Sequence, residues 1–200
     1  MSEYIFLFDL DSTITKVEIL PEIAKTINME EKMRSITDKT MKGELPFDKS
    51  FSNRIEFLKE IPVSRVADIV ANVPLNEKLV EFIRENSDRC YVVTGNLDVW
   101  IAGLMDKLGM KEHCLCSKAI VENDQIISVD KIIDKAEAVK VFDKPFVAIG
   151  DGNNDAPMIE AAEIGIGFGG VREIAPAVLQ CATHATYSED KLCQFLKQLL

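Results

Sequence analysis

Short apolar runs that do not alternate with polar residues recur along the chain. They lie at Ile5–Phe8, Tyr91–Val93, Phe146–Ile149 and Ile164–Phe168, and helical patterns at Leu97–Leu108 and Asp155–Ala162 separate the later ones. Strands without alternation are typical of a sheet covered on both faces, and strands that alternate with helices form parallel sheets. The pattern predicts an α/β fold with a Rossmann-like three-layer core around a parallel sheet.

One interval of the chain lacks strong strand signals. Between residue 15 and about residue 73, glycine and prolines separate four helical segments, which are Glu18–Ile27, Glu30–Met41, Phe47–Glu60 and Ser64–Ala71. We expect a small helical subdomain at residues 15–74, inserted into a core domain of residues 1–14 and 75–200. Farther on, Leu115–Val129 has a polar centre and is typical of a strand and hairpin.

Polar residues follow three of the predicted strands where each one ends. Asp9 and Asp11 follow the first strand, Thr94-Gly95-Asn96 the second, and Gly150–Asp155 the third. Ligands of open parallel sheets bind beyond the carboxyl ends of the strands. Lys135 opens the helix before the third strand and is placed to reach the same edge. The sequence predicts a functional site there, with Asp9 and Asp11 on one face if the strand continues through them.

The residue types at this edge suit phosphoryl chemistry. Asp9, Asp11 and Asp151 offer hard oxygen ligands, which favour Mg2+ over zinc or copper. Thr94 supplies a hydroxyl donor and Lys135 a positive charge for phosphoryl oxygens. One carboxylate can act as nucleophile while a second serves as general acid and base. The residues alone do not say which aspartate attacks.

Composition and charge narrow the class of protein. The 200 residues are 47% hydrophobic and 28% charged, as in a globular chain, and the net charge of −10 argues against a nucleic-acid partner. A bound divalent cation would reverse the field locally for an anionic ligand. No apolar stretch has membrane-spanning length, no basic region precedes the first apolar run, and the five cysteines show no disulfide spacing. We expect a cytoplasmic protein with reduced thiols and no membrane partner. The sequence does not indicate its oligomeric state.

Three other motifs suggest other ligands. A zinc site is conceivable at residues 113–116 and 181–184, where histidine lies beside cysteine, but neither spacing is a common zinc pairing. Residues 151–162 begin like a calcium loop but have alanine at positions six and twelve, where glycine and glutamate are needed. Gly165-x-Gly167-x-x-Gly170 matches the dinucleotide fingerprint, but only about thirty residues follow it, too few for paired nucleotide-binding halves. The phosphoryl site explains more of the sequence than these motifs do.

Four stretches, in order along the chain, resemble the four motifs of the haloacid dehalogenase superfamily. They are "DLDST" at Asp9–Thr13, Thr94 after a strand, Lys135, and "GDGNND" at Gly150–Asp155. Within that superfamily, "DLDSTITKVEILPEIA" and "MKGELPFDKSFSNRI" resemble the first motif and the cap helices of the phosphoserine phosphatase branch. The resemblance spans nearly the whole chain and implies that the helical insertion is a cap.

The resemblance implies roles for the acidic residues of the core. Asp9 would be the nucleophile, and Asp11 would be the general acid and base. The Asp9 carboxylate, the Asp11 backbone carbonyl and Asp151 would hold Mg2+. Asn154 and Asp155 would support the metal region.

The resemblance also implies phosphoryl-binding residues, and here the chain departs from the branch. Thr94 and Lys135 would bind the phosphoryl group, and Lys135 would also restrain Asp9. The branch commonly has Ser-Gly-Gly where this chain has Thr94-Gly95-Asn96. Gly95 and Asn96 would contact the substrate, and Asn96 adds a side chain where a bare backbone usually approaches.

The cap residues imply the substrate class. Glu18 matches the residue that receives a substrate ammonium, Arg54 the residue that grips a carboxylate, and Met41 and Phe47 the apolar residues that close over the substrate. We therefore expect hydrolysis of a small phosphorylated metabolite, O-phospho-L-serine. The alternatives are another phosphate ester, phosphoryl transfer to an alcohol such as homoserine, and a non-catalytic phosphate-binding or regulatory protein.

Overall fold

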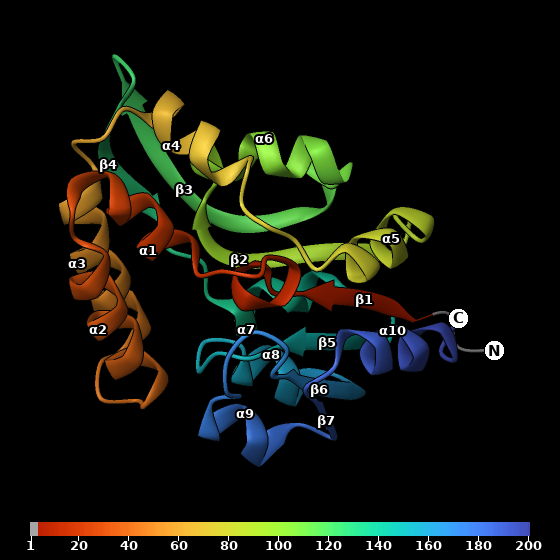
Figure 1. The fold of residues 1–200 in the computed structure, drawn as a ribbon. Coiled ribbons are helices and arrows are strands. Elements are labelled where there is room, and N and C mark those ends of the chain that lie inside the picture. Colours follow the sequence, from red (N-terminus) through yellow and green to blue (C-terminus); the bar gives the residue numbers. More distant parts are fainter. Residues whose placement is uncertain (1–3) are drawn as a thin grey trace.

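The computed structural model describes residues 4–200, which form one seven-stranded sheet between two layers of helices (Figure 1). The strands are β1 (Ile5–Phe8), β2 (Cys90–Leu97), β3 (Cys114–Glu122), β4 (Gln125–Lys131), β5 (Phe146–Gly150), β6 (Ile164–Phe168) and β7 (His184–Thr186). Their order is β4-β3-β2-β1-β5-β6-β7, and every neighbouring pair is parallel except the β3–β4 hairpin. The predicted α/β fold with a Rossmann-like three-layer core is confirmed.

The central strand β1 is buried on both faces, which explains its unbroken apolar run. Phe6 and Phe8 face the core beneath α5 (Glu77–Glu85), α6 (Asp98–Leu108) and α10 (Glu189–Lys197). Ile5 and Leu7 face the opposite core, beneath α7 (Lys135–Ala138), α8 (Ala156–Ala161) and α9 (Pro176–Cys181). Successive side chains of a strand alternate between faces, so two apolar cores demand an apolar residue at every position.

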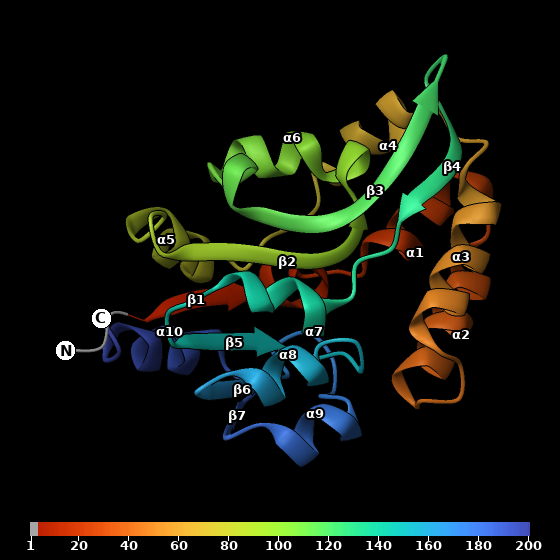
Figure 2. The ribbon, with the colours of Figure 1, turned by 180° about the vertical axis from the view of Figure 1, so that it is seen from behind.

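Four of the five α-helices between β1 and β2 lie within residues 15–74, where the sequence predicts the insertion. They are α1 (Ile19–Ala24), α2 (Glu30–Met41), α3 (Phe47–Leu58) and α4 (Val63–Val70). Helices α2 and α3 stand at the carboxyl end of the strands, while the beginning of β1 and helix α10 lie at the opposite end (Figures 1 and 2). Helix α4 lies along α6 instead. The division of the chain at residues 15–74 stays a prediction.

The predicted hairpin also helps to hold α4. Its tip turns at Asn123 and Asp124, whose φ angles of 49° and 63° are left-handed, as hairpin turns of two residues require. The Asp124 carboxylate accepts hydrogen bonds from the Ser64 backbone N–H at 2.8 Å and the Ser64 hydroxyl at 2.6 Å. The first of these bonds satisfies a backbone donor at the beginning of α4.

Several elements were not predicted from the sequence, namely α5, α9, α10 and β7. No helix within residues 4–200 has both the length and the apolar character needed to cross a membrane.

Candidate active site

The turn after β1 separates the two aspartates of the first motif. The strand ends at Phe8, and Ser12 adopts a left-handed conformation with φ of 57°. The condition for Asp9 and Asp11 to share a strand face is therefore not met. Asp9 continues toward the carboxyl edge of the sheet, whereas one carboxylate oxygen of Asp11 accepts the Ile19 N–H, at the beginning of α1, at 2.8 Å.

Lys135 lies beneath Asp9, at the beginning of α7. Its Nζ is 2.5 Å from Oδ1 of Asp9 and 2.5 Å from Oδ1 of Asp155, and all three side chains are buried. Burial alone would lower the pKa of Lys135, but the charges of Asp155 and Asp9 outweigh this effect and raise the pKa above its ordinary value. Lys135 is therefore a fixed cation that restrains one oxygen of Asp9.

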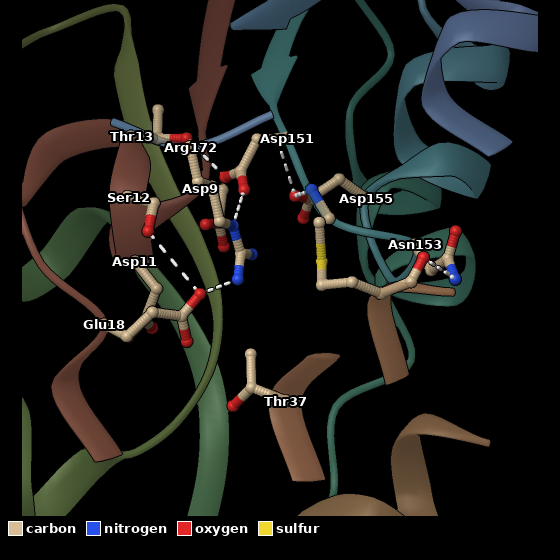
Figure 3. Close-up of polar contacts among 12 residues, drawn as sticks. Asp9, Asp11, Ser12, Thr13, Glu18, Thr37, Asp151, Asn153, Asp155 and Arg172 are labelled. Atoms are coloured by element: carbon tan, nitrogen blue, oxygen red, sulfur yellow. Dashed lines mark hydrogen bonds and ion pairs between the residues drawn. The ribbon is translucent and has the colours of Figure 1, made fainter. Parts of the chain in front are cut away.

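The loop after β5 folds around Asp155. Oδ2 of Asp155 accepts the N–H groups of Asp151 at 3.0 Å and Gly152 at 2.8 Å. Position 150 requires glycine, because a Cβ there would lie 2.6 Å from the Asp155 carboxylate. Asp151 is thereby brought to the end of β1, where the Thr13 hydroxyl donates to it at 3.3 Å (Figure 3).

Three carboxylates converge at this edge of the sheet. Oxygens of Asp9, Asp151 and Asp155 lie within 4.8 Å of one another, and this is the group within residues 4–200 whose side chains are arranged to hold a metal ion. Burial and the charge of Asp155 raise the pKa of Asp9 to about 7, and burial together with Asp155 and Asp9 raises the pKa of Asp151 well above its usual value. A cation with a preference for hard oxygen ligands would relieve this repulsion, so the donor set fits Mg2+.

The end of β2 contributes Thr94, Gly95 and Asn96. The Thr94 hydroxyl is fully buried and accepts the Asn96 N–H at 3.2 Å, and the Asn96 amide donates to the second oxygen of Asp11. Burial raises the pKa of Asp11, while the Ile19 N–H partly offsets the rise. The side chain that departs from the family pattern is therefore a direct partner of Asp11.

Arg54 lies on α3, one of the helices at the carboxyl end of the strands that the family resemblance implies form a cap. Its guanidinium is buried and donates to the Thr37 hydroxyl at 3.0 Å and the Ser50 carbonyl at 3.3 Å. Within residues 4–200, Arg54 forms no ion pair at contact distance with a carboxylate. Burial lowers its pKa to about 10, and the charge of Asp11 opposes the shift. Such a cation is suited to receive an anion from outside the protein.

A cavity lies between the carboxyl edge of the sheet and helices α2 and α3, which belong to the predicted cap. The predicted residues that line it are Asp9, Asp11, Glu18, Met41, Phe47, Arg54, Gly95, Asn96 and Asn154. Phe47 stacks on Phe51 with ring centroids 5.6 Å apart, and its edge contacts the backbone of Gly95, where any Cβ would overlap the ring. The other predicted residues, Thr94, Lys135, Asp151 and Asp155, are buried at the edge of the sheet.

Three polar residues of the cavity, Thr37, Thr40 and Arg172, were not predicted from the sequence. Thr37 binds Arg54 through a contact between two helices, which no sequence pattern indicates. Arg172 follows β6 and the glycines at 169 and 170, and its guanidinium forms ion pairs with Glu18 and Asp151 (Figure 3). The rule used for the first three strands, applied to the end of the fourth, would have found Arg172.

Fold and site together define a hydrolase of the haloacid dehalogenase type. The chain belongs to the haloacid dehalogenase-like hydrolases, because the sequence model of that family matches residues 6–160 and a second model of that description matches residues 128–193. The resemblance in the four motifs is thereby confirmed.

Among individual proteins, the chain is similar to phosphoserine phosphatases. It is 30% identical to the phosphoserine phosphatase of Methanocaldococcus jannaschii over 82% of this chain and 84% of that protein. It superposes on a substrate-bound phosphoserine phosphatase complex with a TM-score of 0.83 and on a phospho-aspartyl intermediate analogue of phosphoserine phosphatase with a TM-score of 0.82. Each match has 27% identity and covers 99% of both chains.

Proposed function

We propose that this protein is a Mg2+-dependent phosphomonoesterase that hydrolyses O-phospho-L-serine to serine and phosphate. The observation that carries the proposal is the pairing of two sites across one cavity. Asp9 with Lys135 lies on the core side, and the buried guanidinium of Arg54, which no carboxylate of residues 4–200 contacts, lies on the cap side. A phosphate ester that also bears a carboxylate matches both. The similarity to phosphoserine phosphatases supports the same substrate.

Asp9 is the proposed nucleophile. Lys135 holds one carboxylate oxygen of Asp9, which leaves the other oxygen to attack phosphorus. The bond from phosphorus to the serine oxygen breaks, and the phosphoryl group passes to Asp9 as an aspartyl-phosphate. Thr94 and Lys135 are proposed to bind the phosphoryl oxygens, and the Asp9, Asp151 and backbone Asp11 oxygens to hold Mg2+, which would offset the charge of the phosphoryl group.

Asp11 is the proposed general acid and base. In its protonated form it gives a proton to the departing serine oxygen, and the resulting carboxylate then takes a proton from the water that attacks the aspartyl-phosphate. A raised pKa favours the protonated form that the first step needs, and burial provides it. Hydrolysis releases phosphate and restores both aspartates.

The cap residues are proposed to read the amino-acid part of the substrate. Arg54 would bind the carboxylate through its guanidinium, and Glu18 the ammonium group through the oxygen that Arg172 does not contact. Met41 and Phe47 would close over the aliphatic carbon, and Gly95 and Asn96 would line the opposite side. The expected partner is therefore a small phosphorylated metabolite, and a cytoplasmic location stays a prediction.

The test is phosphate release from O-phospho-L-serine and from phosphoethanolamine, which lacks the carboxylate, with Mg2+ and with a chelator. We expect Mg2+-dependent release that favours phosphoserine, and no turnover by a folded Asp9→Asn variant. Arg54→Gln should lower kcat/KM for phosphoserine by about 10- to 100-fold, because a hydrogen bond to a charged group contributes roughly 1.5–3 kcal/mol. It should change phosphoethanolamine hydrolysis far less.

Three results would count against parts of the proposal. Equal losses of activity on both substrates in Arg54→Gln would refute the assignment of Arg54 to the substrate carboxylate. Activity in Asp9→Asn would refute the assignment of Asp9 as nucleophile. If phosphoserine is consumed faster with added homoserine and phosphohomoserine accumulates, the reaction is phosphoryl transfer.

A further inference from the structure

Arg172 connects two parts of the site that the proposed function treats separately. It lies after β6, in the loop that leads to α9. Its Nε pairs with Oδ2 of Asp151, and its Nη1 pairs with Oε1 of Glu18 (Figure 3). One guanidinium thus bridges a proposed metal ligand and a proposed substrate ligand.

The contact with Asp151 completes the partners of that carboxylate. Asp151 is fully buried, and its other oxygen accepts the Thr13 hydroxyl at 3.3 Å. A buried carboxylate beside two others needs positive charge, and Arg172 supplies it directly to Asp151 as Lys135 does to Asp9 and Asp155. A metal ion that coordinates Oδ2 of Asp151 meets an oxygen already engaged by a guanidinium.

We propose that Arg172 is a counter-ion that competes with Mg2+ for Asp151, so that the protein binds the metal less tightly than its carboxylates alone would allow. The inference rests on the proposed metal site. The second contact of Arg172, to Glu18, does not involve Asp151 and would hold the guanidinium when it leaves that carboxylate. It therefore remains in the cavity and couples metal binding to the residue proposed to read the substrate ammonium. Such coupling is reciprocal: if bound Mg2+ changes the affinity for the substrate ammonium group through Arg172, the ammonium group changes the affinity for Mg2+ by the same factor.

A second arginine separates direct competition from a general effect of charge. Arg54 also lies in the cavity, and both guanidiniums feel the charge of Asp11. Arg54 contacts Thr37 and Ser50 instead of Asp151. Removing either arginine removes one positive charge from the same cavity, but only the loss of Arg172 frees an oxygen of Asp151.

The test is calorimetric titration of Mg2+ into metal-free protein, without substrate, for the wild type, Arg172→Gln, Arg172→Lys, Arg54→Gln and Asp151→Asn. We expect Arg172→Gln to lower the Mg2+ Kd at least about tenfold, Arg172→Lys to lie between it and the wild type, and Arg54→Gln to change Kd less than about threefold. Asp151→Asn should abolish the binding. Circular dichroism tests whether each variant is folded. If Arg172→Gln does not fold, the comparison is made with Arg172→Lys instead.

Three results would refute the proposal that Arg172 competes with Mg2+ for Asp151. These are an unchanged or weaker affinity in the Arg172 variants, an equal gain in Arg54→Gln, and an absence of Mg2+ binding in both the wild type and Arg172→Gln. Because the titration uses no phosphate ester, a failure to hydrolyse phosphoserine leaves its outcome unaffected. Conversely, phosphoserine hydrolysis can be confirmed while the competition is refuted.

Discussion

Replacing Lys135 by methionine tests the electrostatic design of the core side of the site. Methionine keeps a long side chain and removes the ammonium group, which contacts Asp9 and Asp155 at 2.5 Å each. Lys135 is 3% exposed, so water cannot take over the solvation of the two carboxylates. The variant would leave two buried acids without their shared cation.

The expected loss of stability follows from burial. Removing one partner of a buried ion pair costs roughly 3–5 kcal/mol, because the remaining charge stays desolvated. For a protein of this size, each kcal/mol lowers Tm by about 2–4 °C, so Lys135→Met should melt roughly 6–20 °C below the wild type without metal. Added Mg2+ should recover part of that loss, since a cation among the carboxylates replaces the missing charge.

The matched control is Lys140→Met. Lys140 Nζ lies 2.5 Å from Oε1 of Glu137, the same separation as in the Lys135 pairs, but both side chains are about two-thirds exposed. Exposed pairs contribute at most about 1 kcal/mol, so this variant should melt within a few degrees of the wild type. The assay is thermal unfolding, with circular dichroism as the signal. Similar small shifts in both variants would refute the claim that Lys135 compensates buried charge.

Three further predictions concern the carboxylates and the cap. Because the pKa of Asp9 is raised to about 7, the folded protein keeps a proton that the unfolded chain releases near pH 3.8. Without metal, the wild type should therefore lose stability relative to Asp9→Asn as pH rises from about 4 to 7. A difference in Tm between the two proteins that stays constant over this range would contradict the prediction. Asn153 donates to two backbone carbonyls at the end of α2, at 2.7 and 2.8 Å. Asn153→Ala should therefore raise KM about tenfold and speed proteolysis of the cap, and an unchanged cleavage rate would show that Asn153 does not hold α2 in place. Asn96→Gly removes a hydrogen-bond donor to Asp11 and should raise the pKa of that acid. The fall of kcat at alkaline pH should then move to higher pH. An unchanged pH dependence of kcat would show that the Asn96 amide does not lower the pKa of Asp11.

The sheet was predictable because each core strand carries its own signature. Unbroken apolar runs reported burial on both faces, and the polar residues that follow them marked the carboxyl edge. Shorter or more polar elements escaped the same reasoning. Strand β7 has three residues at the sheet edge, and the amphipathic α10 was overlooked although Ser188 caps it through the Lys191 N–H.

The composition of the site was more predictable than its geometry. Strand ends and motif resemblance indicated which residues gather, but not how their side chains turn. The first strand stops one residue before Asp9, and the left-handed Ser12 then redirects the chain, so Asp11 turns toward α1 and Asn96. The contact of Phe47 with Gly95 likewise depends on how the cap docks, which is a tertiary property.

The contacts between core and cap join residues that lie at the chemistry. Asp11 accepts the first N–H of α1, Asn153 holds the end of α2, and Arg172 pairs with Glu18 while it contacts Asp151. A movement of the cap away from the sheet must therefore disturb the proposed general acid, the loop of the fourth motif and a proposed metal ligand together. Substitutions in these contacts should change KM and kcat jointly, whereas substitutions on the solvent face of α2 should change neither.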